Sequence, residues 1–358
     1  MIRRKKTHGH TPHPPRSEPI LSVKDLSVRF NTVDGVVHAV NSISFDLYRG
    51  ETLGVVGESG SGKSVSMLSL LRLIPEPPGE ITSGSAILRS GDESVDLISL
   101  SWKQMNRVRG RRVGFVFQDP LSSLNPLISV GKQIREIIER HNIARGPAAK
   151  HRSVDLLKQV GISDAGNRYH SYPHEFSGGM RQRVMIAIAI ACNPELVIAD
   201  EPTTALDVTI QAQIIDLLMK LKREMGISVI WISHDLGVVA GIADRVMVMY
   251  GGTGVETGTA ETVYRHPRHP YTVGLLGAIP KLHQDNKRLV NIKGNPPSVY
   301  SALRQCPFAP RCPWSFELCT QQRPPLFALD GNEVSDSGHT SACWYDLEHD
   351  TRRTEDVV

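Results

Sequence analysis

The residues best suited to chemistry form a glycine-rich octapeptide at positions 57–64, with the sequence GESGSGKS. It follows an apolar segment, 52–56, and precedes a helical pattern, which is the context of a phosphate-binding loop. Glycine lets the backbone curve around phosphate and point its N–H groups inward. Lys63 would reach the β- and γ-phosphates, and Ser64 would hold Mg²⁺. This context favours a phosphate loop over an ordinary glycine-rich turn. The predicted nucleotide contacts are Gly57, Glu58, Ser59, Gly60, Ser61, Gly62, Lys63 and Ser64.

A second set of candidate residues follows two later apolar segments. Asp200 and Glu201 end the segment 196–199, and His234 follows 229–232. Asp200 would support Mg²⁺ through water, and Glu201 would orient and partly deprotonate an attacking water. His234 would donate to the γ-phosphate. Taken alone, the acidic pair is equally well explained by a solvated strand end, and a lone histidine is more often structural. These roles therefore depend on the neighbouring phosphate loop.

A third feature is the run Ser177-Gly178-Gly179, which starts a helical pattern over 180–192. Ser177 is a good N-cap, and the exposed N–H groups and dipole of a helix start favour anions. A plain cap needs neither glycine, so the pair indicates that something approaches the backbone closely. The run is of little use to the phosphate loop of its own chain. We therefore expect a second nucleotide-binding chain to face this one, with ATP between them.

Five short apolar runs predict buried parallel strands, because each is rich in Val and Ile and ends at a polar or glycine-bearing loop. They are 52–56, 113–117, 196–199, 229–232 and 246–250. Helical patterns separate several of them, which predicts a doubly wound α/β core. Three earlier segments alternate like half-exposed antiparallel strands and fit a mixed sheet at the N-terminal side. They are 21–30, 39–47 and 85–88.

Amphipathic patterns between Gln118 and Ser177 predict a helical insertion. Apolar residues recur at helical spacing over 130–141 and again over 148–160. A further amphipathic helix is predicted over 210–225.

The composition bounds the class of protein. The chain has 358 residues and a net charge of +4, and much of its basic excess lies in residues 1–16, so we expect no nucleic-acid-binding face. No segment approaches the about 18–20 apolar residues of a membrane span. The basic N-terminus lacks the apolar core of an export signal, and a disordered tail is the better interpretation. We expect a cytosolic chain that reaches a membrane only through a partner.

Four of the five cysteines lie in a proline-rich C-terminal segment with the spacing C-x5-C-x6-C-x23-C. They are Cys306, Cys312, Cys319 and Cys343. Disulfides are unusual in a reducing cytosol, and such a set more often holds Zn²⁺ or an iron–sulfur cluster. The spacing matches neither a zinc ribbon nor a common ferredoxin motif, so the residues alone leave the metal open. Four unligated thiols are the alternative. Cys192 lies on an apolar helix, where core packing explains it.

The ensemble resembles the nucleotide-binding subunit of an ATP-binding-cassette (ABC) transporter over residues 20 to about 265. That family has a P-loop NTPase fold in the α/β class, with a mixed sheet core, N-terminal antiparallel strands and a helical insertion, here about 124–176. In its terms Gln118 matches the Q-loop, 176–180 the signature, 205–207 the D-loop and His234 the switch histidine.

The resemblance implies catalytic roles for Glu201, His234 and Gln118. It further implies nucleotide contacts outside the loop by Phe30, Gln118, Ser177, Gly178, Gly179 and Asp207. Phe30 falls where an aromatic ring usually stacks on adenine, although such a residue is more often core. Met180 and Phe176 replace the glutamine and leucine of the commonest signature.

Longer segments are similar to the oligopeptide, dipeptide and nickel importer branch of the family. They are FQDPLSSLNP at 117–126, FSGGMRQR at 176–183, HPRHPYT at 266–272 and GNPP at 294–297. Met180 and DEPTTA at 200–205 look like the "D" subunit type, which commonly pairs with a similar "F" subunit. Members of this branch carry a [4Fe–4S] cluster in the C-terminal extension. The four cysteines align with it, so the resemblance favours the cluster over Zn²⁺.

The resemblance implies an ATP hydrolase at the cytoplasmic face of the inner membrane that drives solute import. Its expected partners are a second cassette (an F-type paralogue or another copy of this chain), two integral-membrane permeases and an extracytoplasmic solute-binding protein. The expected cargo is peptides, with nickel or another small solute as the alternative. The expected regions are a basic tail (1–19), the nucleotide-binding domain (20–265), a C-terminal extension (266–345) and a tail (346–358).

Two other classes of function are alternatives. A soluble cassette ATPase of translation or DNA repair usually carries paired cassettes or a long coiled-coil insertion, and the sequence predicts neither. A non-hydrolysing subunit would not need Glu201 and His234, although Met180 leaves room for asymmetry between two sites.

Overall fold

The computed structural model describes residues 18–204, 206–278, 292–297, 300, 303–329 and 338–353. Most of the tail predicted over 1–19 lies outside the described residues, and so does Ala205 of the predicted D-loop.

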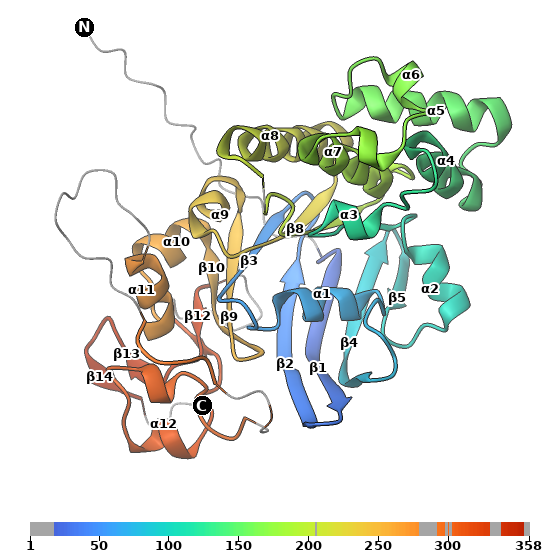
Figure 1. The fold of residues 1–358 in the computed structure, drawn as a ribbon. Coiled ribbons are helices and arrows are strands. Elements are labelled where there is room, and N and C mark those ends of the chain that lie inside the picture. The colour runs from blue at the N-terminus through green and yellow to red at the C-terminus, as the bar shows by residue number, and fades with distance from the viewer. Residues whose placement is uncertain are drawn as a thin grey trace, which may run out of the picture.

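A mixed sheet forms the core, with parallel strands at its centre (Figure 1). In order across the sheet these are β9 (Arg245–Tyr250), β3 (Thr52–Val56), β8 (Ser228–Ser233), β7 (Leu196–Asp200) and β6 (Val113–Val116). Nearly every residue in them is buried, because other elements cover both faces of the sheet. The prediction of five buried parallel strands is confirmed, with small shifts at some strand ends.

The strand order brings the candidate site residues together. β3, β8 and β7 are neighbours, and the register pairs Val56 with Ser233 and Asp200 with Ile232. The phosphate loop, His234 and the acidic pair therefore all emerge at the same edge of the sheet.

The three alternating segments near the N-terminus lie in β1 (Leu21–Thr32), β2 (Gly35–Leu47) and β4 (Gly79–Ser90). Together with β5 (Glu93–Asp96), which was not predicted, these strands form a separate antiparallel sheet in the order β2-β1-β4-β5. We expected them to join a mixed sheet, and that placement is wrong. The antiparallel strands that make the main sheet mixed are at its other end: β10 (Thr253–Thr259), β12 (Thr340–Ser341) and β11 (Phe327–Ala328). The N-terminal strands instead use their apolar face to cover the main sheet, where Leu21 and Leu47 pair and are fully buried.

Helices complete the two layers of core. α1 (Lys63–Leu70) packs between the two sheets, and α2 (Trp102–Val108) closes the same layer. α7 (Gly178–Ile190), α8 (Val208–Met225) and α9 (Leu236–Ile242) cover the opposite face of the main sheet. Trp231 of β8 is fully buried beneath this second layer.

The helical insertion follows β6 and consists of α3 (Pro120–Ser123), α4 (Val130–Arg140), α5 (Gly146–Gln159), α6 (Ala165–Arg168) and the short 3₁₀ helix η1 (Pro173–Glu175). Its apolar faces meet around Ile134, Ile138 and Leu157, all of which are buried. The helices predicted over 130–141 and 148–160 are present as α4 and α5.

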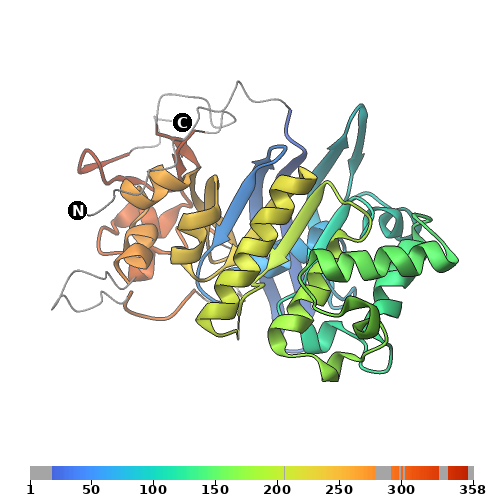
Figure 2. The same cartoon turned by 90° about the horizontal axis from the view of Figure 1, so that it is seen from above.

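The chain beyond β10 forms α10 (Ala260–Arg265), α11 (Pro270–Gly277), the 3₁₀ helix η2 (Ala309–Arg311), α12 (Glu317–Gln321) and a hairpin of β13 (Tyr345–Asp346) and β14 (Thr351–Arg352). The C-terminal extension and the helical insertion lie at opposite ends of the cassette (Figure 2). Structure continues past 345, because Arg353 pairs with Asp346 at 2.9 Å. The tail predicted from 346 is therefore ordered as far as 353.

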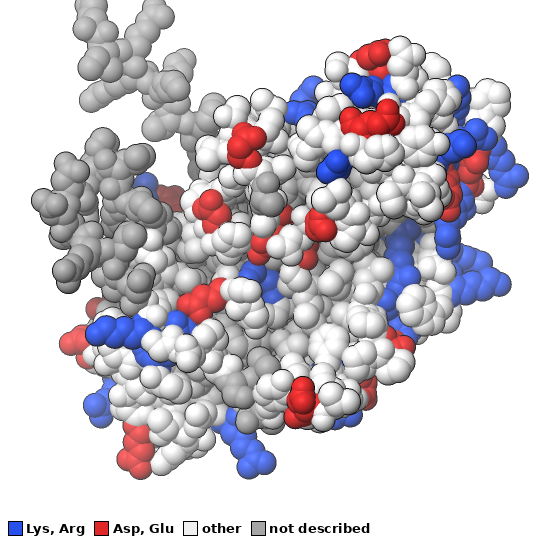
Figure 3. Space-filling view, in the orientation of Figure 1, with Lys and Arg blue, Asp and Glu red and all other residues white. Residues whose placement is uncertain are grey.

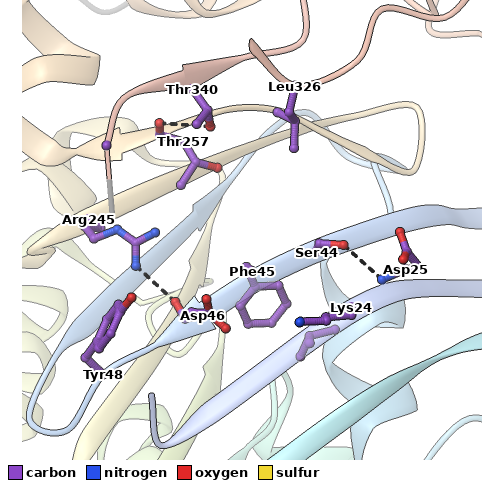
Figure 4. Close-up of a pocket in the computed structure, with 12 residues that line it drawn as sticks. Lys24, Asp25, Ser44, Phe45, Asp46, Tyr48, Arg245, Thr257, Leu326 and Thr340 are labelled. Atoms are coloured by element: carbon purple, nitrogen blue, oxygen red, sulfur yellow. Dashed lines mark hydrogen bonds between the residues drawn. The ribbon is translucent and has the colours of Figure 1, made fainter. Parts of the chain in front are cut away.

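The extension is attached to the cassette by shared sheet strands and by buried polar contacts. β12 pairs with β10, and His339 contacts the fully buried Glu256 at 2.7 Å. A cavity of about 370 Å³ lies along this junction. Arg245 and Phe45 of the cassette face it from one side, and Thr340 of the extension from the other (Figure 4).

The close packing of the insertion predicts a stability effect at Gly131. A Cβ placed there would lie 2.1 Å from the ring of the buried Tyr169. Gly131→Ala should therefore destabilise the chain by about 1–3 kcal/mol, even though alanine favours helix. Gly166→Ala in α6 is the matched control, because no atom lies within 4 Å of its Cβ. Thermal unfolding of the two purified variants measures the difference, and equal unfolding temperatures would contradict this packing.

Candidate functional site

The loop at 57–64 has the conformation that phosphate binding requires. Gly57 has φ +154°, and an added Cβ would lie 2.2 Å from the carbonyl oxygen of Met249. Gly62 caps α1 at φ +93°, and its Cβ would lie 2.5 Å from the carbonyl oxygen of Ala39. Both positions exclude a side chain, so the glycines are needed for backbone geometry as well as for phosphate approach.

The loop opens into a pocket of about 570 Å³. Its lining residues come from α1 and from the ends of β6, β7 and β8, and they are Ser59, Gly60, Ser61, Gly62, Lys63, Ser64, Val65, Gln118, Glu201, Thr204 and His234. The structure thus brings most of the predicted phosphate loop together with all three predicted catalytic residues. Thr204 was not predicted as a site residue. Its position three residues after Glu201 is the sequence signal that could have indicated it.

Lys63 is buried and pointed into its own loop. Its Nζ donates to the carbonyl oxygens of Gly57 at 2.8 Å and Glu58 at 2.9 Å. Burial lowers the pKa of Lys63, and the nearby carboxylates of Glu201 and Asp200 oppose that shift. The ammonium group is thereby held where a phosphate oxygen could replace the two carbonyl acceptors.

Ser64 and Asp200 provide the oxygens for a metal ion. The Ser64 hydroxyl donates to Asp200 Oδ1 at 2.8 Å. Burial raises the pKa of Asp200, while the hydrogen bond from Ser64 favours its ionised form. A hydroxyl and one carboxylate beside a phosphate site fit Mg²⁺, which binds few protein oxygens and completes its shell with water and phosphate.

Glu201 lies where donors from different elements converge on one carboxylate oxygen. Its Oε2 accepts from Gln118 Nε2 at 3.1 Å and from the Thr204 hydroxyl at 2.8 Å, and lies 3.1 Å from His234 Nδ1. Glu201 also has φ +44°, in the left-handed region that non-glycine residues rarely adopt. Such strain is common at functional sites, where it fixes a side chain in one direction. Here the carboxylate is aimed into the pocket.

Several predicted contacts lie outside the pocket lining, among them Phe30, Gly57 and Glu58. Phe30 is half-buried and packs beside Gly79 and against the core layer between the two sheets, which corresponds to its alternative interpretation as a core residue. The side chain of Glu58 turns away and pairs with Arg311 of the C-terminal extension at 2.9 Å. The backbone N–H of Glu58 donates to the Tyr271 hydroxyl at 2.8 Å, so it is already engaged.

The Ser-Gly-Gly run also lies outside the pocket lining, at the start of α7. Ser177 caps this helix and accepts from the Met180 N–H at 3.3 Å. A Cβ at Gly179 would lie 2.6 Å from Ile210 Cγ2, so the close approach inferred from this glycine comes from α8 of the same chain. Asp207 caps α8 by accepting from the Ile210 N–H at 3.0 Å. At Gly178 the nearest atom to an added Cβ is in Leu206, at 3.5 Å.

The four C-terminal cysteines gather in one part of the extension. The Cys306 N–H donates to the Cys319 carbonyl at 3.0 Å, and the thiol of Cys343 interacts electrostatically with the other three. Burial raises the pKa of Cys306 to about 11 and that of Cys312 and Cys343 to about 12. Within the described residues, no three His, Cys, Asp or Glu side chains are close enough to hold a metal ion.

The surface charge of the molecule is mixed. Acidic and basic side chains are interspersed over most of the face in Figure 3. Among the helices that the structure describes, none has the length and apolar character needed to cross a bilayer.

Comparison with known proteins places the chain in a family. Residues 40–204 match the ABC transporter family, and 255–319 match the oligopeptide/dipeptide transporter C-terminal region. The chain is 46% identical to the dipeptide transport ATP-binding protein DppD of Bacillus subtilis (strain 168), over 91% of this chain and 95% of DppD. It is 50% identical to the oligopeptide transport ATP-binding protein OppD of the same bacterium, over 87% of this chain and 86% of OppD.

The fold is also similar to a solved structure, the dimeric ATP-binding cassette MJ0796 in a post-hydrolysis state bound to ADP and Pi. The TM-score is 0.59 with 25% identity, over 67% of this chain and 98% of MJ0796. This chain therefore belongs to the ABC transporter family of ATP-binding proteins.

The position of Lys63 predicts a loss of nucleotide binding on its removal. Lys63→Ala should weaken MgATP binding by about tenfold or more, because the triphosphate loses its buried counter-charge. Lys103→Ala, at an exposed position of α2, is the control and should bind ATP normally. Titration of each full-length variant with a fluorescent ATP analogue measures the effect. Equal affinity in the two variants would exclude the assigned role of Lys63.

Proposed function

We propose that this chain is the ATP-hydrolysing subunit of a membrane importer that takes up oligopeptides or dipeptides. The observation that carries the proposal is the pocket itself, because the phosphate-loop lysine and Glu201 line the same space. The peptide specificity is supported by the similarity to DppD and OppD, which are dipeptide and oligopeptide transport ATP-binding proteins, and by the family match at 255–319.

In the proposed reaction, Lys63 exchanges the carbonyl oxygens of its own loop for the β- and γ-phosphate oxygens of ATP. Mg²⁺, when bound to Ser64 and Asp200, would neutralise the charge that develops on the phosphates. Glu201 orients a water molecule in line with the γ-phosphate and accepts its proton. His234 and Gln118, which contact Glu201 in this structure, turn toward the γ-phosphate and the water respectively.

Hydrolysis is proposed to require two facing cassettes. The N-terminal N–H groups of α7 would contact the γ-phosphate of ATP bound in the loop of the opposite subunit. The opposite subunit is a distinct F-type paralogue or a second copy of this chain. ATP binding then closes the pair, and its cleavage reopens it.

We further propose that two integral-membrane permeases and an extracytoplasmic binding protein complete the importer, with this chain on the cytoplasmic face of the inner membrane. The exposed side chains of Leu121 and Leu127 support this arrangement, because they lie at the start of the helical insertion, shortly after Gln118. Exposed apolar side chains beside a site that responds to nucleotide provide a surface for a permease loop.

For the C-terminal extension, we propose that Cys306, Cys312, Cys319 and Cys343 hold a [4Fe–4S] cluster, with Zn²⁺ as the alternative. The support is the gathering of four largely buried thiols within one small segment. Binding would draw the thiols together and displace their protons, since only thiolates ligate the metal. The cluster would act as a structural clamp and takes no part in the hydrolysis.

Glu201→Gln tests the importer function directly. The variant should keep ATP binding while ATP turnover falls by about a hundredfold or more, because the amide cannot accept the water's proton.

Uptake of a labelled oligopeptide by cells lacking this gene should be restored by the normal chain and not by Glu201→Gln. Glu224→Gln, at an exposed position of α8, is the control. Normal turnover in Glu201→Gln would refute the general-base role. Uptake of labelled nickel but not of peptide would refute the peptide cargo.

Metal analysis tests the four-thiol proposal. Chain purified without air should be brown and contain about four iron atoms. Cys312→Ser and Cys343→Ser should lose that iron, whereas Cys192→Ala should keep it. Zinc in place of iron, or no metal at all, would refute the cluster.

A further inference from the structure

The phosphate loop is held from outside the cassette by one arginine of the C-terminal extension. The guanidinium of Arg311 forms a two-pronged pair with the Glu58 carboxylate, with Nη1 at 2.9 Å from Oε2 and Nη2 at 3.2 Å from Oε1. Planar, two-pronged pairs of this kind fix geometry as well as charge. The two residues are 253 positions apart in the chain.

Arg311 is itself tightly fixed. Its side chain is only 6% exposed. Its Nε donates to the Lys293 carbonyl at 3.0 Å, its Nη2 to the Ile292 carbonyl at 3.2 Å and its Nη1 to the Tyr250 hydroxyl at 3.1 Å. A guanidinium with this many fixed acceptors has one orientation, so the extension sets the position of the Glu58 side chain.

A second contact from the same region holds the backbone of Glu58. Its N–H donates to the hydroxyl of Tyr271 in α11. The ring of Tyr271 packs on Tyr250 and on Phe308, with centroids 4.4 and 5.5 Å away. Phe308 directly precedes η2, which carries Arg311, so one aromatic cluster supports both contacts to the loop.

The pair of Arg311 and Glu58 also changes the charge of the phosphate loop. Glu58 places a carboxylate within the loop that must accept a polyanionic triphosphate, and this carboxylate is close enough to influence Lys63. An unpaired, partly buried carboxylate at this position would repel the phosphates. Arg311 neutralises it while leaving the Lys63 ammonium free to bind phosphate.

We propose that Arg311 is a positioning residue for ATP binding, which holds Glu58 in place and cancels its charge so that the phosphate loop accepts the triphosphate. This role rests on ATP binding by the loop and is independent of the cargo. It gives the extension a function in the nucleotide site of its own chain. Because Arg311 precedes Cys312 directly, the thiol-bearing segment and the phosphate loop are joined through a single side chain.

The test is a pair of substitutions analysed together in the full-length chain in its assembled complex. Arg311→Met should raise the KM for ATP about tenfold while kcat changes less than about twofold, because removal of one partner leaves a carboxylate unpaired. Glu58→Gln alone provides the reference KM, because it removes the carboxylate that pairs with Arg311. The double variant Arg311→Met/Glu58→Gln should return to the KM of Glu58→Gln, since the repelling charge is gone. In Arg311→Met the KM should also fall as the salt concentration rises.

Arg353→Met is the matched control. Arg353 also lies in the ordered C-terminal region, pairs with Asp346 and donates to the Cys343 carbonyl. It has no described contact with the loop, so its loss should leave the KM for ATP unchanged. An unchanged KM in Arg311→Met, or a double variant that stays as impaired as Arg311→Met, would overturn the proposal.

If Arg311→Met does not fold, Arg311→Lys replaces it. Lysine keeps the charge and loses the two-pronged geometry, so the KM should rise about threefold and recover with Glu58→Gln. An unchanged KM, or an increase without recovery, would again overturn the proposal. Nucleotide titration of the purified chain separates this outcome from failure of the transport function, because it involves neither permease nor cargo.

Discussion

In the proposed importer, the ATP site of this chain is half of a site that a second cassette completes, and the rest of the account depends on that constraint. The pocket is lined by most of the phosphate loop, including Ser64, and by the proposed general base, whereas the N-terminus of α7 lies outside its lining. Two groups suited to phosphate therefore sit on one chain without sharing a ligand. A second cassette turned to face the first would bring each helix start to the other's loop. Nucleotide binding would then draw the two subunits together, because the phosphates of one ATP would contact the phosphate loop of one subunit and the start of α7 of the other.

The contacts that Lys63 and Glu201 make in this structure are the ones that ATP and a water molecule would replace. Lys63 is bound by the carbonyl oxygens of its own loop, and one oxygen of Glu201 is occupied by donors from the Q-loop, from β8 and from the turn after β7. Each of these contacts must be exchanged when ATP and a water molecule enter. The strained backbone at Glu201 keeps the carboxylate pointed inward through that exchange. Arg311 of the C-terminal extension pairs with Glu58 of the phosphate loop, so two distant parts of the chain contribute to the proposed triphosphate site.

Most of this site could be predicted from local sequence motifs, whereas the contacts between distant parts of the chain could not. Lys63, Ser64, Asp200 and Glu201 could be placed from sequence, because a phosphate loop and a strand end fix each residue relative to its own strand, and parallel strands end at one edge. The pair of Glu58 and Arg311 could not, since nothing near either residue indicates a partner 253 positions away. The glycine at 179 was interpreted correctly as a site of close approach, but the approaching group is Ile210 of the neighbouring helix. The N-terminal strands were also assigned to the wrong sheet. Alternation of apolar and polar residues indicates that a strand is half-buried, but it does not indicate which sheet the strand joins.

The most direct test of the shared site is vanadate photocleavage of the assembled complex. Vanadate trapped with MgADP occupies the position of the γ-phosphate, and ultraviolet light then cuts the polypeptides that surround it. If two chains enclose each nucleotide, this chain will be cut within 57–64 and also next to Ser177, where it faces the nucleotide of the other subunit. Cuts confined to 57–64, with the start of α7 intact in both subunits, would contradict the account.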